Sequence, residues 1–438
     1  MKLHYSILAG TTFLFSSIAN IGYSQNKQPA PPPPAVVAGI PVNYDEAKVG
    51  TYTLPDPLIL NNGSKVKDKN TWLNKRRPEI LKLAEENQFG IVPGKPADMH
   101  FEVFDKGTPA FDGKAIRKQV TVYFSKDTIH KMDLLIYLPA NAKKPVPLLL
   151  AISFSPNSST VDDPGVKPGL VWGKDGKRIP APPARGGIGK LDVNKFISKG
   201  LGIATVYYGD IEPDFKEGIK YGIRGQYLKP GMTYTADNEW GAIAAWSWGL
   251  SRAMDYLETD KDVDAKRVAV TGASRLGKTA LWTGARDTRF AVVIASISGE
   301  SGASLSRRNY GETVKHMTDT SRFFYQFAPV YHSYADRVNE LPVDGHMLIS
   351  LIAPRPLLLQ TGDTDFWSDP KGEFLAAVAA EPVYKLFGEK GPGTAKMPAA
   401  GEATMLNDLG YYMHSGGHAV LPTDYDVFVT YLQKYLKP

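Results

Sequence analysis

The amino-acid sequence predicts an α/β fold, with a doubly wound, mostly parallel sheet in a single large domain. Two observations predict it. Short apolar segments of strand-forming residues alternate with segments whose apolar residues recur at helical spacing. In addition, VPLLLAISF (146–154) is a continuous apolar run, as expected of a strand that is covered by helices on both faces. A chain of 438 residues is long enough to bury a large core.

The expected elements follow one another from residue 44 onward, without a second linker or an internal repeat. KQVTVYF (118–124) and KMDLLIYLP (131–139) are expected as neighbouring strands, and residues 241–258 have the apolar spacing of a helix. A Pro- and Gly-rich segment, 157–189, is expected as a long insertion over one face. The other expected elements are strands at 146–154, 202–208, 267–272, 290–298 and 355–363, and helices at 278–287 and 424–436.

The first 43 residues are expected to lie outside this domain. Lys2 precedes an apolar stretch that ends in small residues near Ser24, which is the layout of a cleavable signal peptide at 1–24. A membrane anchor is the alternative, but the stretch is shorter than the ~20 apolar residues that span a bilayer. A Pro-rich leader at 25–43 follows, and 44–438 forms the domain. We therefore expect a secreted or periplasmic bacterial protein with no membrane attachment after the signal is removed.

The composition excludes several kinds of site. The formal net charge is +6, and Lys and Arg are interspersed with Asp and Glu, so no basic stripe for nucleic acid is expected. Cysteine is absent, which excludes disulfides, a cysteine nucleophile and thiolate metal sites. We expect a monomer that uses no metal and no cofactor.

The segment TGASRLGKTALW (271–282) is consistent with two kinds of site. The phosphate-binding pattern G-x-x-x-x-G-K-[ST] is matched by Gly272, Gly277, Lys278 and Thr279. The same segment places Ser274 on a Gly-flanked turn between a strand and a helix, as a serine hydrolase does. A phosphate-binding loop needs Mg²⁺ held by a carboxylate at another strand end, whereas strands 146–154 and 290–298 end in Ser-rich segments. The pattern therefore favours a nucleophile over a phosphate site.

A serine nucleophile needs an acid and then a histidine later in the chain. His418 lies in a Gly-rich loop just before the last helix, with His414 as its rival, and structural roles are expected for His100, His130, His316 and His332. Between Ser274 and His418, the segment 357–370 ends a strand in an acidic loop. Its carboxylates are Asp363, Asp365 and Asp369. The order Ser, acid, His favours a nucleophile elbow at Ser274.

The segment around Ser274 departs from the usual G-x-S-x-G pattern, and in this departure it resembles the corresponding segment of a known family. GASRLGK (272–278) resembles the G-C-S-R-x-G-K signature of the glucuronoyl esterases, carbohydrate esterase family fifteen, with Ala273 in place of Cys. The resemblance runs from about Leu148 to the C-terminus. It continues through SLSRRNYGE (304–312), LPVDGHMLISLIAPRPLLL (341–359), DFWSDPKGEF (365–374) and HSGGH (414–418). It implies an α/β-hydrolase fold and metal-independent cleavage of esters that join glucuronic acid branches of xylan to lignin alcohols.

The resemblance also implies roles for single residues. Ser274 matches the nucleophile and His418 the general base, and Arg275 matches the residue that supports the oxyanion. An oxyanion needs donors that are fixed in advance, and losing one costs ~3 kcal/mol. The positions that contact the uronic acid in the family are matched by Lys278, Glu312 and Trp367.

Two departures from the family bear on specificity and on the acid. FFYQF (323–327) stands where bacterial relatives often have a His-Trp pair, and Ile297 stands where many members have an early acid. Glu300 lies three residues beyond Ile297. Asp365 precedes Trp367 with the D-x-W spacing of bacterial relatives, so we expect Asp365 to be the acid. The rivals are Asp363, Asp369 and Glu300.

These expectations define a serine carboxylic ester hydrolase that cleaves esters of (4-O-methyl-)glucuronic acid through an acyl-enzyme, with a plant cell-wall glycan as its substrate. An esterase for acetyl or feruloyl groups is the alternative among enzymes. A carbohydrate-binding protein without catalysis on a hydrolase fold is the alternative outside them.

Overall fold

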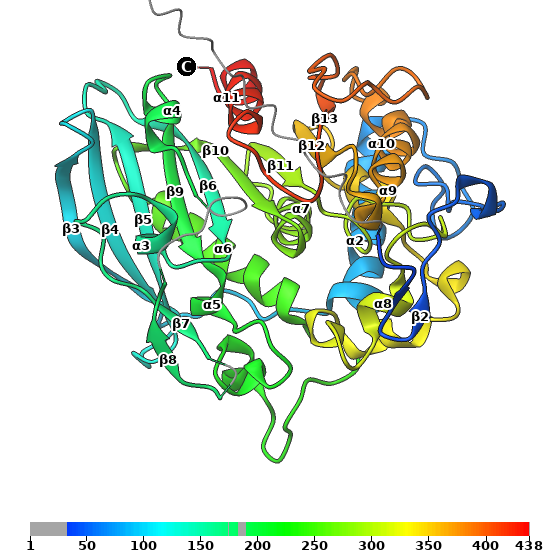
Figure 1. Cartoon of the computed structure of the whole chain (residues 1–438), viewed down its shortest axis with the longest axis horizontal. Coiled ribbons are helices and arrows are strands. Elements are labelled where there is room, and N and C mark those ends of the chain that lie inside the picture. Colours follow the sequence, from blue (N-terminus) through cyan, green and yellow to red (C-terminus); the bar gives the residue numbers. More distant parts are fainter. Residues whose placement is uncertain (1–32, 174, 183–189, 438) are drawn as a thin grey trace, which may run out of the picture. The chain divides into compact units, whose positions relative to one another are not determined.

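A nine-stranded sheet organises the computed structural model, which describes residues 33–173, 175–182 and 190–437. Its strand order is β13-β12-β11-β10-β6-β9-β5-β4-β3 (Figure 1). The six strands from β13 to β9 are parallel, and β5, β4 and β3 continue the sheet antiparallel. The expected doubly wound, mostly parallel sheet is therefore confirmed. The strand bounds are β3 His100–Ala110, β4 Ala115–Tyr123, β5 Lys131–Pro139, β6 Val146–Ser153, β9 Gly202–Tyr207, β10 Val263–Ala273, β11 Val292–Ser296, β12 Leu357–Gly362 and β13 Leu409–His414.

Helices cover both faces of the sheet because the central strands are apolar on both sides. In β6, Leu148 and Leu150 face one hydrophobic cluster while Leu149 faces the other. One face packs against α6 (Ala242–Leu257), α7 (Arg275–Arg286), α9 (Gly345–Ser350) and α10 (Pro370–Lys385). The opposite face packs against α4 (Val193–Ile197) and α11 (Asp424–Tyr435). Shorter helices are α1 (Lys69–Thr71), α2 (Arg77–Ala84), α3 (Asn157–Thr160), α5 (Tyr208–Ile211) and α8 (Val314–Thr318).

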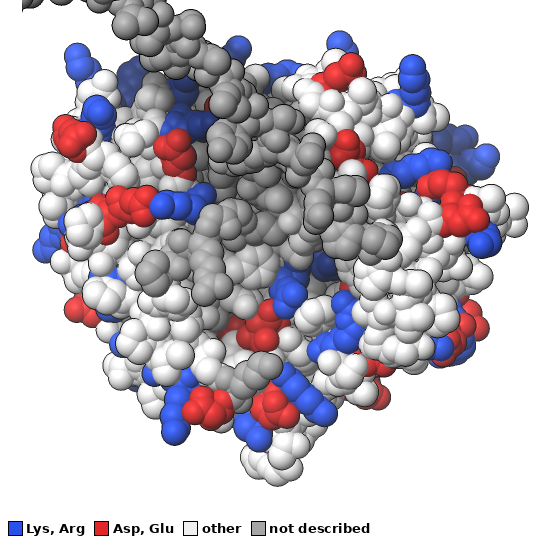
Figure 2. All heavy atoms as spheres, viewed as in Figure 1, with Lys and Arg blue, Asp and Glu red and all other residues white. Residues whose placement is uncertain are grey.

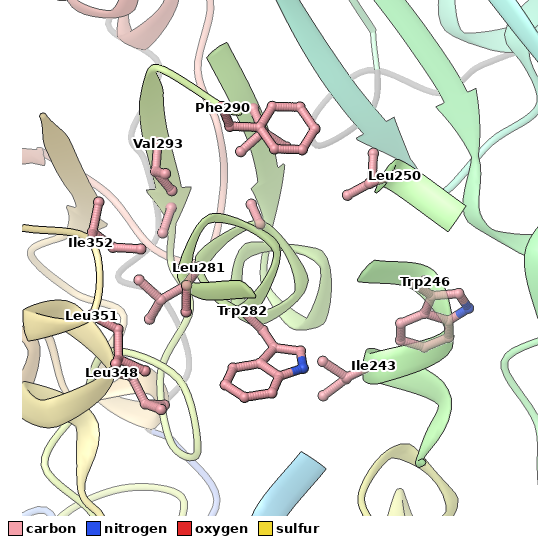
Figure 3. Close-up of a cluster of buried hydrophobic side chains, with 14 of the residues drawn as sticks. Ile243, Trp246, Leu250, Leu281, Trp282, Phe290, Val293, Leu348, Leu351 and Ile352 are labelled. Atoms are coloured by element: carbon pink, nitrogen blue, oxygen red, sulfur yellow. The ribbon is translucent and has the colours of Figure 1, made fainter. Parts of the chain in front are cut away.

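The helix α7 lies at the centre of the larger cluster (Figure 3). Trp282 and Leu281 point from it towards α6 on one side and towards the α9 segment on the other, where Ile243 and Leu348 are labelled. The ring of Phe89 stacks on Trp282 with 4.3 Å between centroids. Since α7 begins directly after Ser274, this packing fixes the helix that carries the candidate nucleophile.

Every expected strand and helix is present, with ends shifted by a few residues. The largest functional difference is in α7, which begins at Arg275 and not at Lys278, because Gly277 lies inside the helix. The strands β3 and β13 and the helix α10 were not expected. β3 is an exposed edge strand that contains Gly and Pro, and α10 contains Pro382, so neither has a clear periodic pattern.

The N-terminal segments were expected outside the domain. The signal peptide 1–24 and most of the leader lie outside the described residues. Residues 36–41 form a small hairpin of β1 (Val36–Val37) and β2 (Ile40–Pro41), and Asn43 is hydrogen-bonded to the 309–311 segment. Among the described residues, no helix has the length and apolarity needed to cross a membrane.

The expected insertion 157–189 contains α3 and a hairpin of β7 (Leu170–Trp172) and β8 (Arg178–Pro180), while positions 174 and 183–189 lie outside the described residues. Arg117 and Tyr137 of the antiparallel strands bind Asp163, at 2.9 and 2.8 Å, and so attach the insertion to the sheet.

On the face seen in Figure 2, acidic and basic side chains are interspersed.

Candidate active site

Ser274 occupies a strained turn between β10 and α7. Its backbone has φ 58° and ψ −127°, a conformation that non-glycine residues adopt only when the surrounding structure enforces it. The Ser274 N–H donates to the Ser296 carbonyl at 2.9 Å. A Cβ atom on Gly277 would lie 2.4 Å from the same carbonyl oxygen, and one on Gly272 would lie 2.2 Å from the Leu276 carbonyl oxygen. The two glycines therefore allow the sharp turn that presents the Ser274 side chain.

The alternative of a phosphate site at this turn is not favoured by the structure. The Thr279 side chain is fully buried, and its hydroxyl donates to the Arg275 carbonyl inside α7 at 2.9 Å. It is therefore not available to a bound Mg²⁺. Within the described part of the chain, no three His, Asp or Glu side chains lie together in a way that could hold a metal ion.

His418 and Asp365 form a close pair beyond the ends of β13 and β12. The distance from His418 Nδ1 to Asp365 Oδ2 is 2.7 Å, and Ser368 Oγ lies 3.1 Å from the same nitrogen. The Asp365 side chain is 4% exposed and that of His418 is 38% exposed. A buried carboxylate on Nδ1 leaves Nε2 free to accept a proton. The structure gives no hydrogen bond between Ser274 Oγ and the imidazole, a contact that often tightens only when substrate binds.

The rival acids are engaged elsewhere. Glu300 Oε1 accepts hydrogen bonds from Ser306 Oγ at 2.6 Å and from the Ser301 N–H at 2.8 Å, and burial raises its pKa to about 8. Asp363 accepts the Gly416 N–H, and Asp369 caps α10 and binds Arg308. None of these three carboxylates contacts His418 in the described structure.

The side chain of the rival base, His414, makes structural hydrogen bonds through both ring nitrogens. Its Nδ1 lies 2.9 Å from Asp424, and its Nε2 lies 3.0 Å from the Gly417 carbonyl. Burial opposes protonation of His414, but Asp424 outweighs this and raises its pKa. Both ring nitrogens are occupied, so His414 orders the loop that presents His418. His130, His316 and His332 also have local hydrogen-bond partners, as expected of structural residues.

Arg275 combines a backbone donor with a fixed guanidinium. As the first residue of α7, it has an N–H without an intrahelical acceptor, next to Ser274. Asp214 binds the guanidinium and is itself held by Tyr325 and Gln326, at 2.9 and 2.8 Å. The guanidinium lies 4.4 Å from the ring centroid of Phe323. Donors fixed in this way are suited to stabilising an oxyanion.

Lys278 is a largely buried lysine for which the described residues supply no ionic partner. Its side chain is 5% exposed, and it has neither a hydrogen bond nor an ion pair from Nζ among the described residues. Burial lowers the pKa of Lys278, while the nearby Glu312 opposes this effect. An ammonium group on a largely buried side chain, with no fixed partner among the described residues, is suited to binding an anionic or hydroxyl-bearing ligand.

Glu312 and Trp367, the two other positions at which the resemblance implies contact with a uronic acid, lie side by side. The Glu312 N–H donates to the Trp367 carbonyl at 2.8 Å. Arg322, which the sequence did not indicate, joins them. Its Nη2 donates to Glu312 Oε1 at 2.9 Å and its Cζ lies 5.1 Å from the Trp367 ring centroid, whereas its Nη1 is buried without a partner.

Glu373 of α10 is another residue near the site that the sequence did not indicate, and its carboxyl group is buried. Its Oε1 accepts the Gly299 N–H at 2.6 Å, while its Oε2 is buried without a partner. Burial raises the pKa of Glu373 to about 8, and the charge of Asp365 acts in the same direction. Glu373 therefore anchors the loop after β11, where Ile297, Gly299 and Ser301 all have positive φ.

These features define a class of protein: the sheet, the strained serine at a strand–helix turn and the His–carboxylate pair are those of an α/β-hydrolase. Residues 187–388 match the family model described as "Glucuronyl esterase, fungi". A glucuronoyl esterase from Solibacter usitatus is 46% identical, and the match covers 90% of this chain and 100% of that chain with a TM-score of 0.85. The chain therefore belongs to the glucuronoyl esterases of carbohydrate esterase family 15, a family of carboxylic ester hydrolases.

Two further relatives belong to the same family or class. A structure described as a promiscuous family 15 esterase from a marine bacterial metagenome is 41% identical, with a TM-score of 0.80 over 90% of this chain and all of that one. The carbohydrate esterase MZ0003, from an unknown prokaryotic organism, is 43% identical over 90% of this chain and 92% of its own length. The expected family and α/β-hydrolase fold are thus confirmed.

Proposed function

We propose that this enzyme hydrolyses esters of 4-O-methylglucuronic acid, the linkages between xylan branches and lignin alcohols, through a covalent acyl-enzyme. The observation that carries the proposal is the largely buried side chain of Lys278, one turn along α7 from Ser274, whose Nζ has no hydrogen bond or ion pair among the described residues. An esterase for apolar acyl groups has no use for a cation at this position, whereas a sugar acid supplies polar oxygens to it.

The chemistry follows from the described side chains. Ser274 Oγ attacks the ester carbonyl carbon while His418 Nε2 takes its proton, and the imidazolium is stabilised by Asp365 on Nδ1. The Arg275 N–H and guanidinium donate to the carbonyl oxygen as it becomes an oxyanion. His418 then gives the proton to the departing alcohol, which leaves the acyl-enzyme. A water molecule deprotonated by His418 then attacks the acyl carbon. As the bond to Ser274 Oγ breaks, His418 returns this proton to Oγ, and the uronic acid is released.

In the binding of the sugar, Lys278 and Glu312 supply a donor and an acceptor for its hydroxyl groups, and Trp367 supplies a flat apolar surface for its ring. Arg322 adds a second donor, because its Nη1 has no protein partner. We further propose that the enzyme is an exported, periplasmic or secreted monomer whose residues 1–24 are a cleaved signal peptide and whose residues 25–43 are a leader.

The test compares two substrates in matched variants. Wild-type enzyme is expected to hydrolyse benzyl glucuronate, and Ser274→Ala is expected to abolish turnover. Lys278→Met and Glu312→Gln should reduce kcat/KM on benzyl glucuronate by at least ten times more than on 4-nitrophenyl acetate, because the lost contact belongs to the sugar. Equal losses on both substrates would show that these residues do not bind the uronic acid.

A broader ester specificity is the second candidate. It is favoured by the position of Arg322 over Trp367, which occupies a surface that a sugar ring would use, and by the relative whose description is promiscuous. If acetylated xylan is hydrolysed faster than benzyl glucuronate, this candidate replaces the first. Absence of turnover on all three esters would instead indicate a carbohydrate-binding protein without catalysis.

A further inference from the structure

A basic groove lies at the end of the sheet opposite the candidate active site. Ser274 follows the carboxyl end of β10, whereas the residues that line the groove flank the first residues of β6 and β9 and the ends of α4 and α11. These strands and helices are labelled in Figure 1. Its hollow has a volume of about 590 Å³. The groove residues that matter here are Lys143, Lys144, Lys199, Arg267 and Lys437.

The charge of this groove is of one sign. Its lining contains five cationic side chains from four separate chain segments and, among the described residues, no Asp or Glu. Arg267 is paired with Asp264 at 2.8 Å, which lies outside the lining. Lys143, Lys144 and Lys199 are exposed, and none of them has an ion pair within the described part of the chain. Like charges that converge without counter-charges repel one another, so an anionic ligand would relieve this repulsion.

The apolar residues of the lining and the extent of the groove indicate the shape of the ligand. Pro145, Pro147, Leu201 and Leu436 belong to the lining together with the cations. A second hollow of about 910 Å³ shares Asn141 and Lys199 with the first, and its lining adds Lys114 and Lys195 together with one carboxylate, Asp192. Lys195 is paired with Asp426 and Lys114 with Asp112, so the unpaired cations are those of the first hollow. An extended ligand with anionic groups at intervals and apolar C–H faces between them fits this arrangement. A compact anion such as phosphate would use only a small part of it.

We propose that this groove binds an anionic, uronate-bearing polysaccharide and holds the polymer at a second site, remote from the catalytic serine. The proposal rests on the proposed function, because glucuronoxylan carries free uronates beside the esterified ones. Binding at the groove raises the local concentration of ester branches without contacting the reacting atoms.

The experiment uses the full-length enzyme and measures binding and catalysis separately. The triple variant K143Q/K144Q/K199Q is compared with a matched control, K65Q/K67Q/K69Q, which removes the same charge from exposed lysines in another part of the surface. Thermal unfolding midpoints within about 2 °C of wild type establish that both variants fold. Affinity electrophoresis then measures binding to glucuronoxylan and to the same xylan after its carboxyl groups are reduced.

We expect the groove variant to bind glucuronoxylan at least ten times more weakly than wild type, while the control changes less than three-fold. We also expect wild-type binding to weaken steeply between 50 and 500 mM NaCl and to be weak on the reduced xylan. Equal weakening in both variants, or equal binding to both xylans, would overturn the proposal. Retention on anionic lipid vesicles or duplex DNA, but not on glucuronoxylan, would overturn it as well.

Turnover of benzyl glucuronate separates this proposal from the proposed function. The groove variant should keep wild-type kcat/KM on this small ester, because the groove lies at the other end of the sheet. A loss of more than five-fold would show that the groove is not a separate site. If wild-type enzyme binds glucuronoxylan through the groove but hydrolyses no glucuronate ester, the proposed function is wrong, whereas the proposal that the groove binds the polysaccharide is supported.

Discussion

Replacing Asp365 by Asn tests the candidate triad most directly. The change keeps the size of a side chain that is 4% exposed, but it removes the negative charge 2.7 Å from His418 Nδ1. Two unit charges at this distance interact by ~6 kcal/mol at an effective dielectric constant of about 20. Because 38% of the His418 side chain is exposed, solvent screens this interaction, and we take about half of it, ~3 kcal/mol.

This free energy sets the expected loss of turnover. At about 1.4 kcal/mol for each factor of ten, ~3 kcal/mol lowers kcat by ~10². Ser368 Oγ, 3.1 Å from the same nitrogen, can still accept a hydrogen bond and so keep the imidazole in its productive tautomer. If the Asn side chain instead stabilises the other tautomer, the loss rises towards ~10⁴. We therefore expect kcat to fall by between ~10² and ~10⁴.

The assay is steady-state hydrolysis of benzyl glucuronate by Asp365→Asn beside Glu300→Gln. Glu300 does not contact His418 in the described structure, so Glu300→Gln should keep kcat within about ten-fold of wild type once its folding is verified by circular dichroism. If Asp365→Asn has near-wild-type activity while Glu300→Gln is inactive, the acid of the triad is Glu300 and the reasoning is refuted.

Three further predictions concern metal, pH and stability. Excess chelator should leave ester turnover unchanged, because a serine mechanism supplies its own nucleophile and oxyanion donors; a loss that a divalent ion restores would contradict this. The pKa of Glu373 is raised by burial to about 8 from 4.5, so its folded carboxyl stays protonated while the unfolded one ionises, and stability falls as pH rises through this window by up to about 1.4 kcal/mol per pH unit. Urea unfolding of Glu373→Gln at pH 5, 6.5 and 8 should therefore show a shallower decline than wild type, and an equal slope would show that Glu373 is ionised when folded. Trp282→Ala should lower the free energy of unfolding by ~3–5 kcal/mol, whereas Trp282→Phe should cost less than ~2 kcal/mol because it keeps stacking on Phe89; equal costs would show that the stacked ring contributes little.

The fold could be predicted where the chain has strong periodic patterns. The central strands are apolar on both faces, and α6 and α11 have regular apolar spacing, so their existence follows from the sequence. The edge strand β3 is mostly exposed and has register shifts against β4, and such a strand depends on its neighbour more than on its own sequence. The start of α7 was misjudged because a glycine inside a helix looks like a turn until its packing is known.

The residues of the candidate site could be predicted only where they belong to a short sequence motif. Ser274, Arg275 and Lys278 lie on one turn and its helix, and Asp365 and Trp367 lie on one loop, so a short pattern contains each group. Asp214 and Arg322 approach the site from segments that have no motif, 61 residues before Arg275 and ten residues after Glu312. Their roles depend on the tertiary contacts with Arg275 and Glu312, which no local pattern records.

The strand order explains how Asp365 comes to lie against His418. β12 and β13 are adjacent and parallel, with Gly362 opposite His414. Asp365 lies three residues beyond Gly362 and His418 four beyond His414, so both residues leave the sheet at nearly the same level.

Hydrogen bonds between the two loops then hold them together. The Asp363 N–H donates to the His414 carbonyl at 3.0 Å, and the Gly416 N–H donates to the Asp363 carboxylate at 2.7 Å. β11 is one strand farther from β13, and its Ile297 packs into the hydrophobic cluster beneath α11 with φ 41°. An acid on the loop after β11 would start one strand farther from His418 than Asp365 does, and in this chain that loop has Ile297 where many members of the family have the acid. The adjacency of β12 and β13 and the apolar residue at position 297 together support Asp365 as the acid.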